Sequence, residues 1–539
     1  MTAQMKHTGE DVIDQKSTNV HVEPPKYFMP VFLAVIVGTL IYIGIQLSND
    51  LAHVPPLHLY SVVLLGTALF IALAFEFVNG FHDTANAVAT VIYTNALPAP
   101  VAVMWAGFCN FLGVMVASGA VAYGIIALLP VELIMNVGSG AGFAMVFALL
   151  LAAIIWNLGT WFFGIPASSS HTLIGSIVGV GLMNQLLHAN MGGASGIDVE
   201  QMTKVGKALL FSPLVGFAFA LVLFLLVKFI FKKQLELFKP PVGNTPPPPI
   251  IRGILIFTCT GVSFAHGSND GQKGMGLIML ILIGLVPLAY SLNKTLDEQH
   301  IQSFEQLSTQ AALVIYPQHA DIADEEARQV ITTYIQTREI TPEVVPALAS
   351  LTDHLGDRLA LYPDLNKIPE KEVTVLRNDM YLSTTAFKRL DKAESLPEMS
   401  LEQQQVVQDY RKHLDAFLQY IPTWVKVAVA LALGLGTMVG WKRIVVTVGE
   451  RIGKHHMTYG QGMSAELVAM STIAAADGIG MPVSTTHVLN SAVAGTMVAN
   501  KSGLQMSTIK TILSAWVLTL PATIMLSGGL YWLFLSLIQ

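Results

Sequence analysis

Gly164-Ile-Pro-Ala-Ser-Ser-Ser-His171-Thr-Leu173 is a stretch that occurs again as Gly480-Met-Pro-Val-Ser-Thr-Thr-His487-Val-Leu489. The glycine, the proline, the three hydroxyl positions, the histidine and the leucine keep their spacing, and both copies stand in strongly apolar surroundings. A Gly-x-Pro break followed by hydroxyls is typical of the start of a half-helix. The first backbone N–H groups of such a helix lack partners and can bind an anion together with the hydroxyls. Two such starts that face one another would form an anion site.

The composition indicates an integral membrane protein. Of the 539 residues, 53% are hydrophobic and only 12% are charged, whereas soluble domains have about 25% charged residues. Apolar runs long enough to cross the ~30 Å hydrocarbon layer as helices recur along the chain. The two cysteines, Cys109 and Cys259, lie in apolar runs and indicate neither a disulfide framework nor a metal site. We expect an all-α membrane protein with about 10–12 transmembrane segments, no cofactor and no nucleic-acid partner.

Composition also divides the chain into segments. Residues 240–249 form a polyproline-like linker, and residues 291–420 are rich in Asp, Glu, Gln and Lys, which predicts a soluble helical insertion. The expected segments are a polar tail (1–27), an extra transmembrane helix (28–50), a first membrane repeat (55–231), a Pro-rich linker (232–250), the first part of a second repeat (251–290), the insertion (291–420) and the rest of the second repeat (421–539).

The spacing of matched motifs indicates a duplication. Asp83 precedes Ser168 by 85 positions, and Asp270 precedes Ser484 by 214. The excess of 129 is almost the length of the insertion, which has 130 residues, so removing the insertion brings the halves into register.

Lys and Arg in short loops predict how the chain is oriented in the membrane, because short loops rich in these residues are mostly cytoplasmic. They form two clusters, one of Lys228, Lys232, Lys233, Lys239 and Arg252 and one of Lys442, Arg443, Arg451 and Lys454. We expect both clusters in the cytoplasm, the insertion on the opposite side and the two halves inverted relative to one another.

Each half carries an aspartate within a long apolar run. His82-Asp83-Thr84-Ala85-Asn86 aligns with Asn269-Asp270-Gly271-Gln272-Lys273. The first run has about 35 residues, which exceeds one crossing at ~1.5 Å per residue, so we expect a broken helix in each half. A carboxylate with amides at a helix break suits a small cation. The alternative is that each aspartate caps a helix end or pairs with a basic residue.

The hydroxyls after the two Gly-x-Pro breaks suit an oxyanion, because each donates one hydrogen bond and the helix N-terminus adds backbone donors. Alternatively, these hydroxyls serve only the close packing of helices. His171 and His487 have two interpretations as well, a hydrogen bond or proton relay to the opposite half, or a purely structural role.

With these motifs, the chain resembles the PiT family of inorganic phosphate transporters. The resemblance rests on Gly80–Asn86, Gly267–Lys273 and the two Pro-x-Ser-Ser/Thr-Ser/Thr-His elements, and it covers roughly residues 55–290 and 420–539. The insertion resembles that of the low-affinity bacterial branch. This resemblance implies inverted repeats with broken helices and two helical hairpins, a homodimer in the bacterial inner membrane, and import of phosphate by symport with H⁺ or Na⁺.

The family motif assigns roles to individual residues. The phosphate-binding residues would be Ser168, Ser169, Ser170, Ser484, Thr485 and Thr486, and the residues that bind the coupling cation or gate the site would be Asp83, Asn86, Asn269 and Asp270.

This chain departs from the family's Asn-Asp-x-x-Asn pattern at His82 and at Lys273. Both changes remove amide oxygens from a sodium site, and histidine titrates near neutral pH, so we expect coupling to protons. His82 and Lys273 are therefore also expected to bind the coupling cation or gate the site, with Lys273 placing a fixed positive charge where a cation would sit or attracting the phosphate directly. The bacterial branch further implies that Mg²⁺ or Ca²⁺ travels with phosphate.

Two other functions remain open. One is transport of sulfate or another oxyanion on the same scaffold. Sulfate cannot donate a hydrogen bond at neutral pH, so a buried carboxylate near the hydroxyls favours hydrogen phosphate. The other is an intramembrane hydrolase that uses Ser170 with His171 or Asp270. Adjacent residues on a helix point in different directions, which argues against the first of these pairs.

Overall fold

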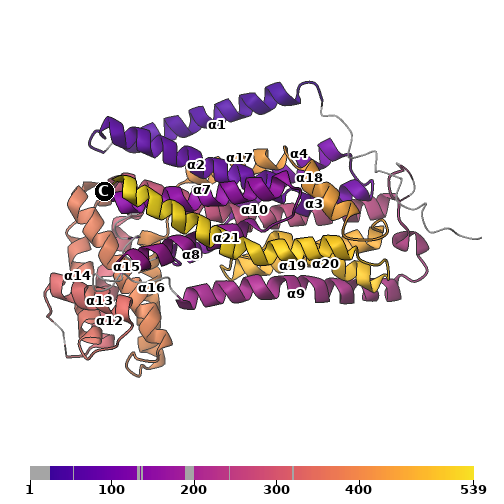
Figure 1. Ribbon diagram of the computed structural model, residues 1–539. Helices are drawn as coiled ribbons and strands as arrows, with labels where there is room; N and C mark the ends of the chain where they lie inside the picture. Colours follow the sequence, from indigo (N-terminus) through magenta and orange to yellow (C-terminus); the bar gives the residue numbers. More distant parts are fainter. Residues whose placement is uncertain are drawn as a thin grey trace, which may run out of the picture.

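The computed structural model describes residues 25–52, 54–129, 134, 138–188, 199–241, 243, 245–318 and 321–538. Helices dominate this part of the chain, and no β-strand is formed among these residues (Figure 1). The all-α prediction is confirmed. Of the polar tail predicted for residues 1–27, residues 1–24 lie outside the described residues.

The helices of the first half precede the proline-rich linker. They are α1 (Phe28–Leu51), α2 (Leu59–Asp83), α3 (Ala85–Tyr93), α4 (Ala99–Val116), α5 (Ala120–Ile126), α7 (Gly140–Phe162), α8 (Ser169–His188) and α9 (Val199–Ile230).

The second half is interrupted by a group of helices with its own core. The second half begins with α10 (Pro249–Leu285) and α11 (Pro287–Tyr290). The interrupting helices are α12 (Glu298–Ile315), α13 (Asp324–Thr337), α14 (Val344–Ala360), α15 (Glu370–Lys392) and α16 (Leu401–Leu418). The membrane helices resume as α17 (Thr423–Thr437), α18 (Lys442–Glu450), α19 (Tyr459–Gly478), α20 (Thr485–Ala499) and α21 (Met506–Ile538).

Seven of the described helices are long and apolar enough to cross a membrane, with α2 and α3 counted together. The number is eight if α16 and α17, which meet at an angle of 68°, count as one span. It is lower than the expected 10–12. One reason is that α17 and α20 have only 15 residues each, fewer than the roughly 20 that a full crossing needs.

The helix breaks predicted at the two aspartates are mostly absent. Between α2 and α3 the helix is interrupted only at Thr84, whose backbone stays helical at φ −51° and ψ −39°. In the second half, α10 runs for 37 residues without a break, so the break predicted at 268–273 is wrong. The polar side chains there find partners on neighbouring segments, as when Gln272 Oε1 accepts a hydrogen bond from the Val121 N–H at 2.9 Å. A buried polar side chain therefore does not require an open backbone.

Equivalent helices of the two halves pack in exchanged pairs. Helix α8 packs on α21 while α20 packs on α9, and α2 packs on α17 while α10 packs on α4. Glycines at matched positions allow α2 to approach α17 and α10 to approach α4 closely. A Cβ on Gly80 would lie 2.2 Å from the Leu433 oxygen, and one on Gly267 would lie 2.2 Å from the Asn110 oxygen. The halves thus correspond contact by contact, while their inverted orientation in a bilayer stays a prediction.

The two repeated stretches form the turns of two helical hairpins, α7–α8 and α19–α20. Gly164 and Gly480 both have φ of +68°, a left-handed conformation that glycine adopts without the cost of a Cβ clash. The next helices begin at Ser169 and Thr485. Helices therefore start where the two motifs predict them.

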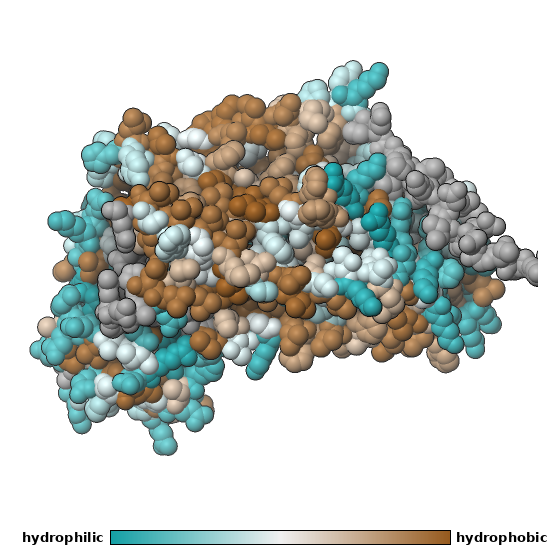
Figure 2. All heavy atoms as spheres, viewed as in Figure 1, coloured by the Kyte–Doolittle hydropathy of each residue, from teal (hydrophilic) through white to brown (hydrophobic). Residues whose placement is uncertain are grey.

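Helices α12–α16 surround an apolar core that includes Phe304, Tyr410 and Phe417. They lie at one end of the bundle (Figure 1). The loops with the two basic clusters lie at the other end, where Arg252 Nε donates to the Ala96 oxygen at 2.9 Å and Tyr93 donates to Glu450 at 2.7 Å. Figure 2 shows a hydrophobic band over the long helices, with hydrophilic surface concentrated at both ends. This band is the part that the hydrocarbon layer would cover.

Candidate functional site

The residues predicted from the sequence lie in the interior of the helical bundle. Each of them has at most 2% of its surface exposed. They are His82, Asp83, Asn86, Ser168, Ser169, Ser170, Asn269, Asp270, Lys273, Ser484, Thr485 and Thr486. Helices α2, α3 and α10 carry the ionisable groups and the amides, and the two hairpins carry the hydroxyls.

Asp83 accepts hydrogen bonds from hydroxyls of both hairpins. Ser169 Oγ donates to Oδ2 at 2.7 Å, and Thr486 Oγ1 donates to Oδ1 at 2.5 Å. Asn86 Nδ2 also donates to Oδ1, at 3.3 Å, and His82 Nδ1 lies 3.5 Å from the same oxygen. One carboxylate therefore joins the tips of the two hairpins.

Asp270 has cationic partners on its own helix. Lys273 Nζ lies 2.7 Å from Oδ1, and His266 Nε2 lies 3.3 Å from Oδ2. Ser169 Oγ is 3.4 Å from Oδ2, so the same hydroxyl lies between both aspartates. Lys273 Nζ also donates to Ser170 Oγ at 2.5 Å.

Lys273 and Asn86 have equivalent positions and equivalent contacts. Each stands three residues after its aspartate, and each donates to that aspartate and to the third hydroxyl of the other half's hairpin. Asn86 Nδ2 contacts Thr486 Oγ1 at 2.9 Å, as Lys273 contacts Ser170. The second half therefore holds a fixed positive charge where the first half holds a neutral amide.

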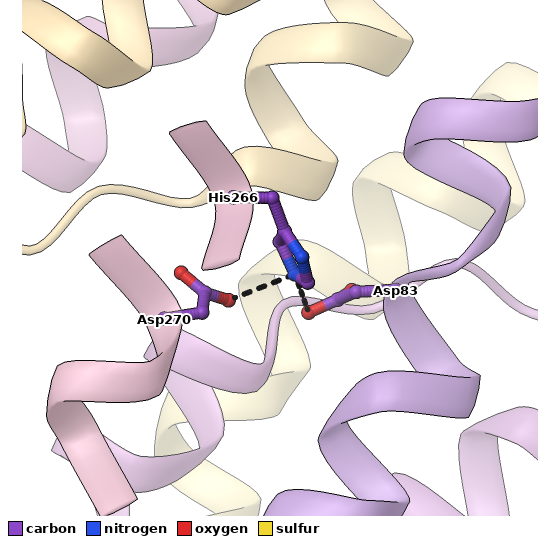
Figure 3. A group of neighbouring side chains, drawn as sticks. All are labelled: Asp83, His266 and Asp270. Atoms are coloured by element: carbon purple, nitrogen blue, oxygen red, sulfur yellow. Dashed lines mark ion pairs between the residues drawn. The ribbon is translucent and has the colours of Figure 1, made fainter. Parts of the chain in front are cut away.

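His266 is a residue that the sequence analysis missed. Its Nε2 lies 3.3 Å from Asp270 Oδ2 and 3.8 Å from Asp83 Oδ2 (Figure 3). Its Nδ1 lies 3.1 Å from Asn110 Oδ1, and the Asn110 amide is oriented by its bond to Thr437 Oγ1 at 2.8 Å. Both ring nitrogens thus face acceptors, which an imidazolium satisfies. The available signal was its place one helical turn before Asp270, within a run that otherwise looked apolar.

The group Asp83, His266 and Asp270 offers ligand atoms within 4.8 Å of one another, an arrangement that could hold a cation. Two features reduce the need for a metal ion there. Lys273 already neutralises Asp270, and the hydroxyls of Ser169 and Thr486 satisfy Asp83.

The first hydroxyl of each triplet caps a helix. The His171 N–H donates to Ser168 Oγ and the His487 N–H donates to Ser484 Oγ, both at 3.1 Å. These two serines therefore act as helix N-caps, and their part in anion binding stays a prediction. The rings of His171 and His487 lie 4.4 Å apart, where the two hairpins meet.

His82 and Asn269, the residues before the two aspartates, contact the two hairpins through hydrogen bonds. His82 Nε2 lies 3.1 Å from Thr160 Oγ1 on α7. At the matching position Asn269 Nδ2 donates to the Met481 oxygen at 3.2 Å, in the turn between α19 and α20. Both side chains thus have structural contacts, and their role with a cation stays a prediction.

Residues 79–527 match the model of the phosphate transporter family. The chain belongs to this family. The chain is 43% identical over 505 residues to two low-affinity inorganic phosphate transporters of Escherichia coli K12, PitB and PitA, which covers 89% of the chain and 99% and 98% of these relatives. A low-affinity inorganic phosphate transporter of Buchnera aphidicola is 40% identical over 510 residues, covering 89% of the chain and all of the relative.

The solved structure of a sodium-dependent phosphate transporter has 19% identity and a TM-score of 0.48, covering 88% of this chain and all of that one. Membership of the phosphate transporter family makes this chain a multi-pass membrane transporter. The hydrolase alternative is excluded, because the named relatives are transporters.

Proposed function

We propose that this protein imports inorganic phosphate across the cytoplasmic membrane by symport with protons. The observation that carries the proposal is the position of His266 between two buried carboxylates, next to the hydroxyls of both hairpins. The names of the relatives from Escherichia coli support phosphate as the substrate.

In this proposal the hairpin tips hold the anion. When phosphate binds, the hydroxyls of Ser169 and Thr486 turn from Asp83 to donate to the anion. The hydroxyl of Ser170 turns from the Val483 oxygen and donates to the anion as well. The starts of α8 and α20 add backbone N–H groups and the helix dipole. Lys273 Nζ, already 2.5 Å from Ser170 Oγ, supplies positive charge. Asp83 selects hydrogen phosphate over sulfate, because only the former can donate a hydrogen bond to a carboxylate.

His266 carries the coupling proton in this proposal, and Lys273 takes the place of a second cation. The ammonium group of Lys273 lies 2.7 Å from Asp270 Oδ1 and neutralises that carboxylate, so its attraction for Na⁺ is weak. An imidazole between two carboxylates, in contrast, can accept and release a proton, as a proton carrier must. Mg²⁺ or Ca²⁺ crosses the membrane with phosphate in this proposal, and uptake should then fall when both metals are chelated.

The test is phosphate uptake in proteoliposomes. We expect equal uptake with and without Na⁺, and loss of uptake when the proton gradient is collapsed. Strict dependence of uptake on Na⁺ would contradict symport with protons. Competition separates the oxyanions: arsenate should compete with labelled phosphate and sulfate should not, and competition by sulfate alone would favour a sulfate permease.

The variant His266→Gln keeps hydrogen-bonding capacity but cannot carry a proton. We expect it to retain phosphate exchange at equal pH on both sides, and to lose at least about tenfold of uptake driven by a proton gradient. His58→Gln, at an exposed position before α2, is the matched control and should behave like the unaltered protein. Full gradient-driven uptake by His266→Gln would assign the proton to another group.

A further inference from the structure

A cavity of about 730 Å³ lies between the membrane helices and the helices of the insertion. Its membrane wall comes from α5, α8, α9 and α10, and includes Tyr123, Gln185 and Ile283. Its other wall comes from α13, α15 and α16.

The cavity is lined by an excess of cations. Seven basic side chains and two acidic ones line it, namely Lys204, Arg338, Arg377, Lys388, Arg389, Lys392 and Arg411 against Glu200 and Asp415. The insertion as a whole has the opposite balance, with 21 acidic and 12 basic residues in 291–420. Six of those 12 basic residues line the cavity, but only one of the 21 acidic residues does. The insertion therefore concentrates positive charge on the wall that faces the membrane helices.

Arg377 is the most deeply buried of these cations, with 7% of its surface exposed. Its guanidinium donates to the Ile134 oxygen and to Asn378 Oδ1, both at 3.0 Å, and lies 5.8 Å from the Tyr381 ring centroid. Among the described residues no carboxylate forms an ion pair with it. Burial lowers the pKa of Arg377 to about 10, so the side chain is charged at neutral pH.

Two other arginines of the insertion, Arg328 and Arg358, show that a carboxylate partner is available when the fold needs one. On α15, two residues after Arg377, Asp379 accepts from Arg328 Nε at 2.6 Å and from Arg358 Nη1 at 2.8 Å. A buried cation without a counter-ion is costly unless an anion from outside compensates it. The cavity beside Arg377 offers the room for such an anion.

The cavity also lies on the helices that build the transport site. Gln185 is 16 residues after Ser169 on α8, and Ile283 is 13 residues after Asp270 on α10. At ~1.5 Å per residue, the cavity lies about 20 Å along both helices from the carboxylates. An anion held there would be at the end of the helices that lead to the hairpin tips.

We propose that this cavity is a vestibule that collects free oxyanions, with inorganic phosphate as its ligand, and delivers them to the site between the hairpins. The identity of the ligand rests on the proposed function. The mechanism is electrostatic: a concave wall with an excess of positive charge raises the local anion concentration and the rate of entry. The insertion thereby has a function in capture, while the transport chemistry belongs to the membrane helices.

The test is the kinetics of phosphate uptake by the full chain, in cells that lack other phosphate carriers. We expect Arg377→Gln combined with Lys388→Gln to raise KM for phosphate about five- to tenfold with Vmax unchanged, and to weaken the dependence of KM on ionic strength. Lys367→Gln combined with Lys371→Gln removes the same two charges from exposed side chains of the insertion that do not line the cavity, and should leave KM unchanged. Arg377→Lys keeps the charge and should restore most of the affinity.

The outcomes separate this proposal from the proposed function. Absence of phosphate uptake by the unaltered chain would overturn the proposed function. Normal uptake with an unchanged KM in the variant of Arg377 and Lys388 would overturn the vestibule alone, and so would an equal rise in KM in the control variant of Lys367 and Lys371. In proteoliposomes, a KM difference that appears only with anionic lipids would assign the cavity to a lipid headgroup and overturn capture of free phosphate.

Discussion

At the residue scale, the asymmetry between the two halves is concentrated at Lys273. Its ammonium group is fully buried and has two partners, the Asp270 carboxylate and the Ser170 hydroxyl. Removing one member of a buried ion pair leaves an uncompensated charge, which costs about 3–5 kcal/mol. The neutral amide of Asn86 makes the two equivalent contacts, with Asp83 and Thr486, without such a constraint.

Lys273→Asn should make the second half resemble the first. The amide can contact both partners, but Asp270 then lacks its fixed cation, so we expect uptake to become stimulated by Na⁺. Lys273→Met removes the charge without replacing the hydrogen bonds, and should destabilise the purified protein by about 3–5 kcal/mol. Uptake with and without Na⁺ and thermal unfolding measure the two effects. An unchanged response to Na⁺ in Lys273→Asn would show that Lys273 does not substitute for a cation.

At the element scale, the two hairpins depend on their turns. Gly164 and Gly480 share a left-handed backbone and leave little room for a Cβ, which would lie 3.3 Å from the Arg443 oxygen and 3.1 Å from Ala120 Cβ respectively. Each turn sets where the following helix begins, and hence where the hydroxyls of the site lie.

Gly164→Ala and Gly480→Ala should each destabilise the protein by about 1–2 kcal/mol, since a Cβ in the left-handed region costs about that much. We also expect a lower Vmax, because the hydroxyls after the turn move relative to Asp83. Gly159→Ala, in α7 of the same hairpin, is the control, since a Cβ there has nothing within 4 Å. Equal melting temperatures for Gly164→Ala and Gly159→Ala would contradict this account.

The sequence was sufficient to predict the hairpin turns and the helix starts, because glycine, proline and hydroxyls act through their immediate neighbours. It was misleading for α10, because a run of polar residues does not reveal whether neighbouring helices will satisfy them. His266 was missed because its partner Asp83 lies on a different helix and its own surroundings are apolar. The basic cavity could not be predicted for a similar reason, since its walls come from segments as far apart in the sequence as Tyr123 and Arg411.

At the scale of the whole molecule, the insertion is a folded unit joined to the membrane part through specific contacts. Its own stability relies in part on Asp379, which is buried and binds Arg328 and Arg358. Arg377 then bridges from the insertion to the Ile134 oxygen. The positions of the basic side chains that line the cavity therefore depend on the folding of the insertion helices that carry them.

Asp379→Asn should destabilise the insertion by about 3 kcal/mol, the low end for a buried ion pair, because both arginines are partly exposed. Limited proteolysis should then cut within 291–420 while the membrane helices stay intact. Asp357→Asn, at an exposed position on α14, should have no such effect. Resistance of the Asp379→Asn insertion to protease would mean that its apolar core suffices.

The exchanged contacts of Asn86 with Thr486 and of Lys273 with Ser170 bear on the rate of the transport cycle. A site that opens to one side and then to the other must break these contacts in turn. The first joins neutral groups, whereas the second involves an ammonium group, and hydrogen bonds from ionised donors are about twice as strong. In the proposed transport cycle we therefore expect the two openings to have unequal barriers, and the opening that frees Ser170 to limit turnover.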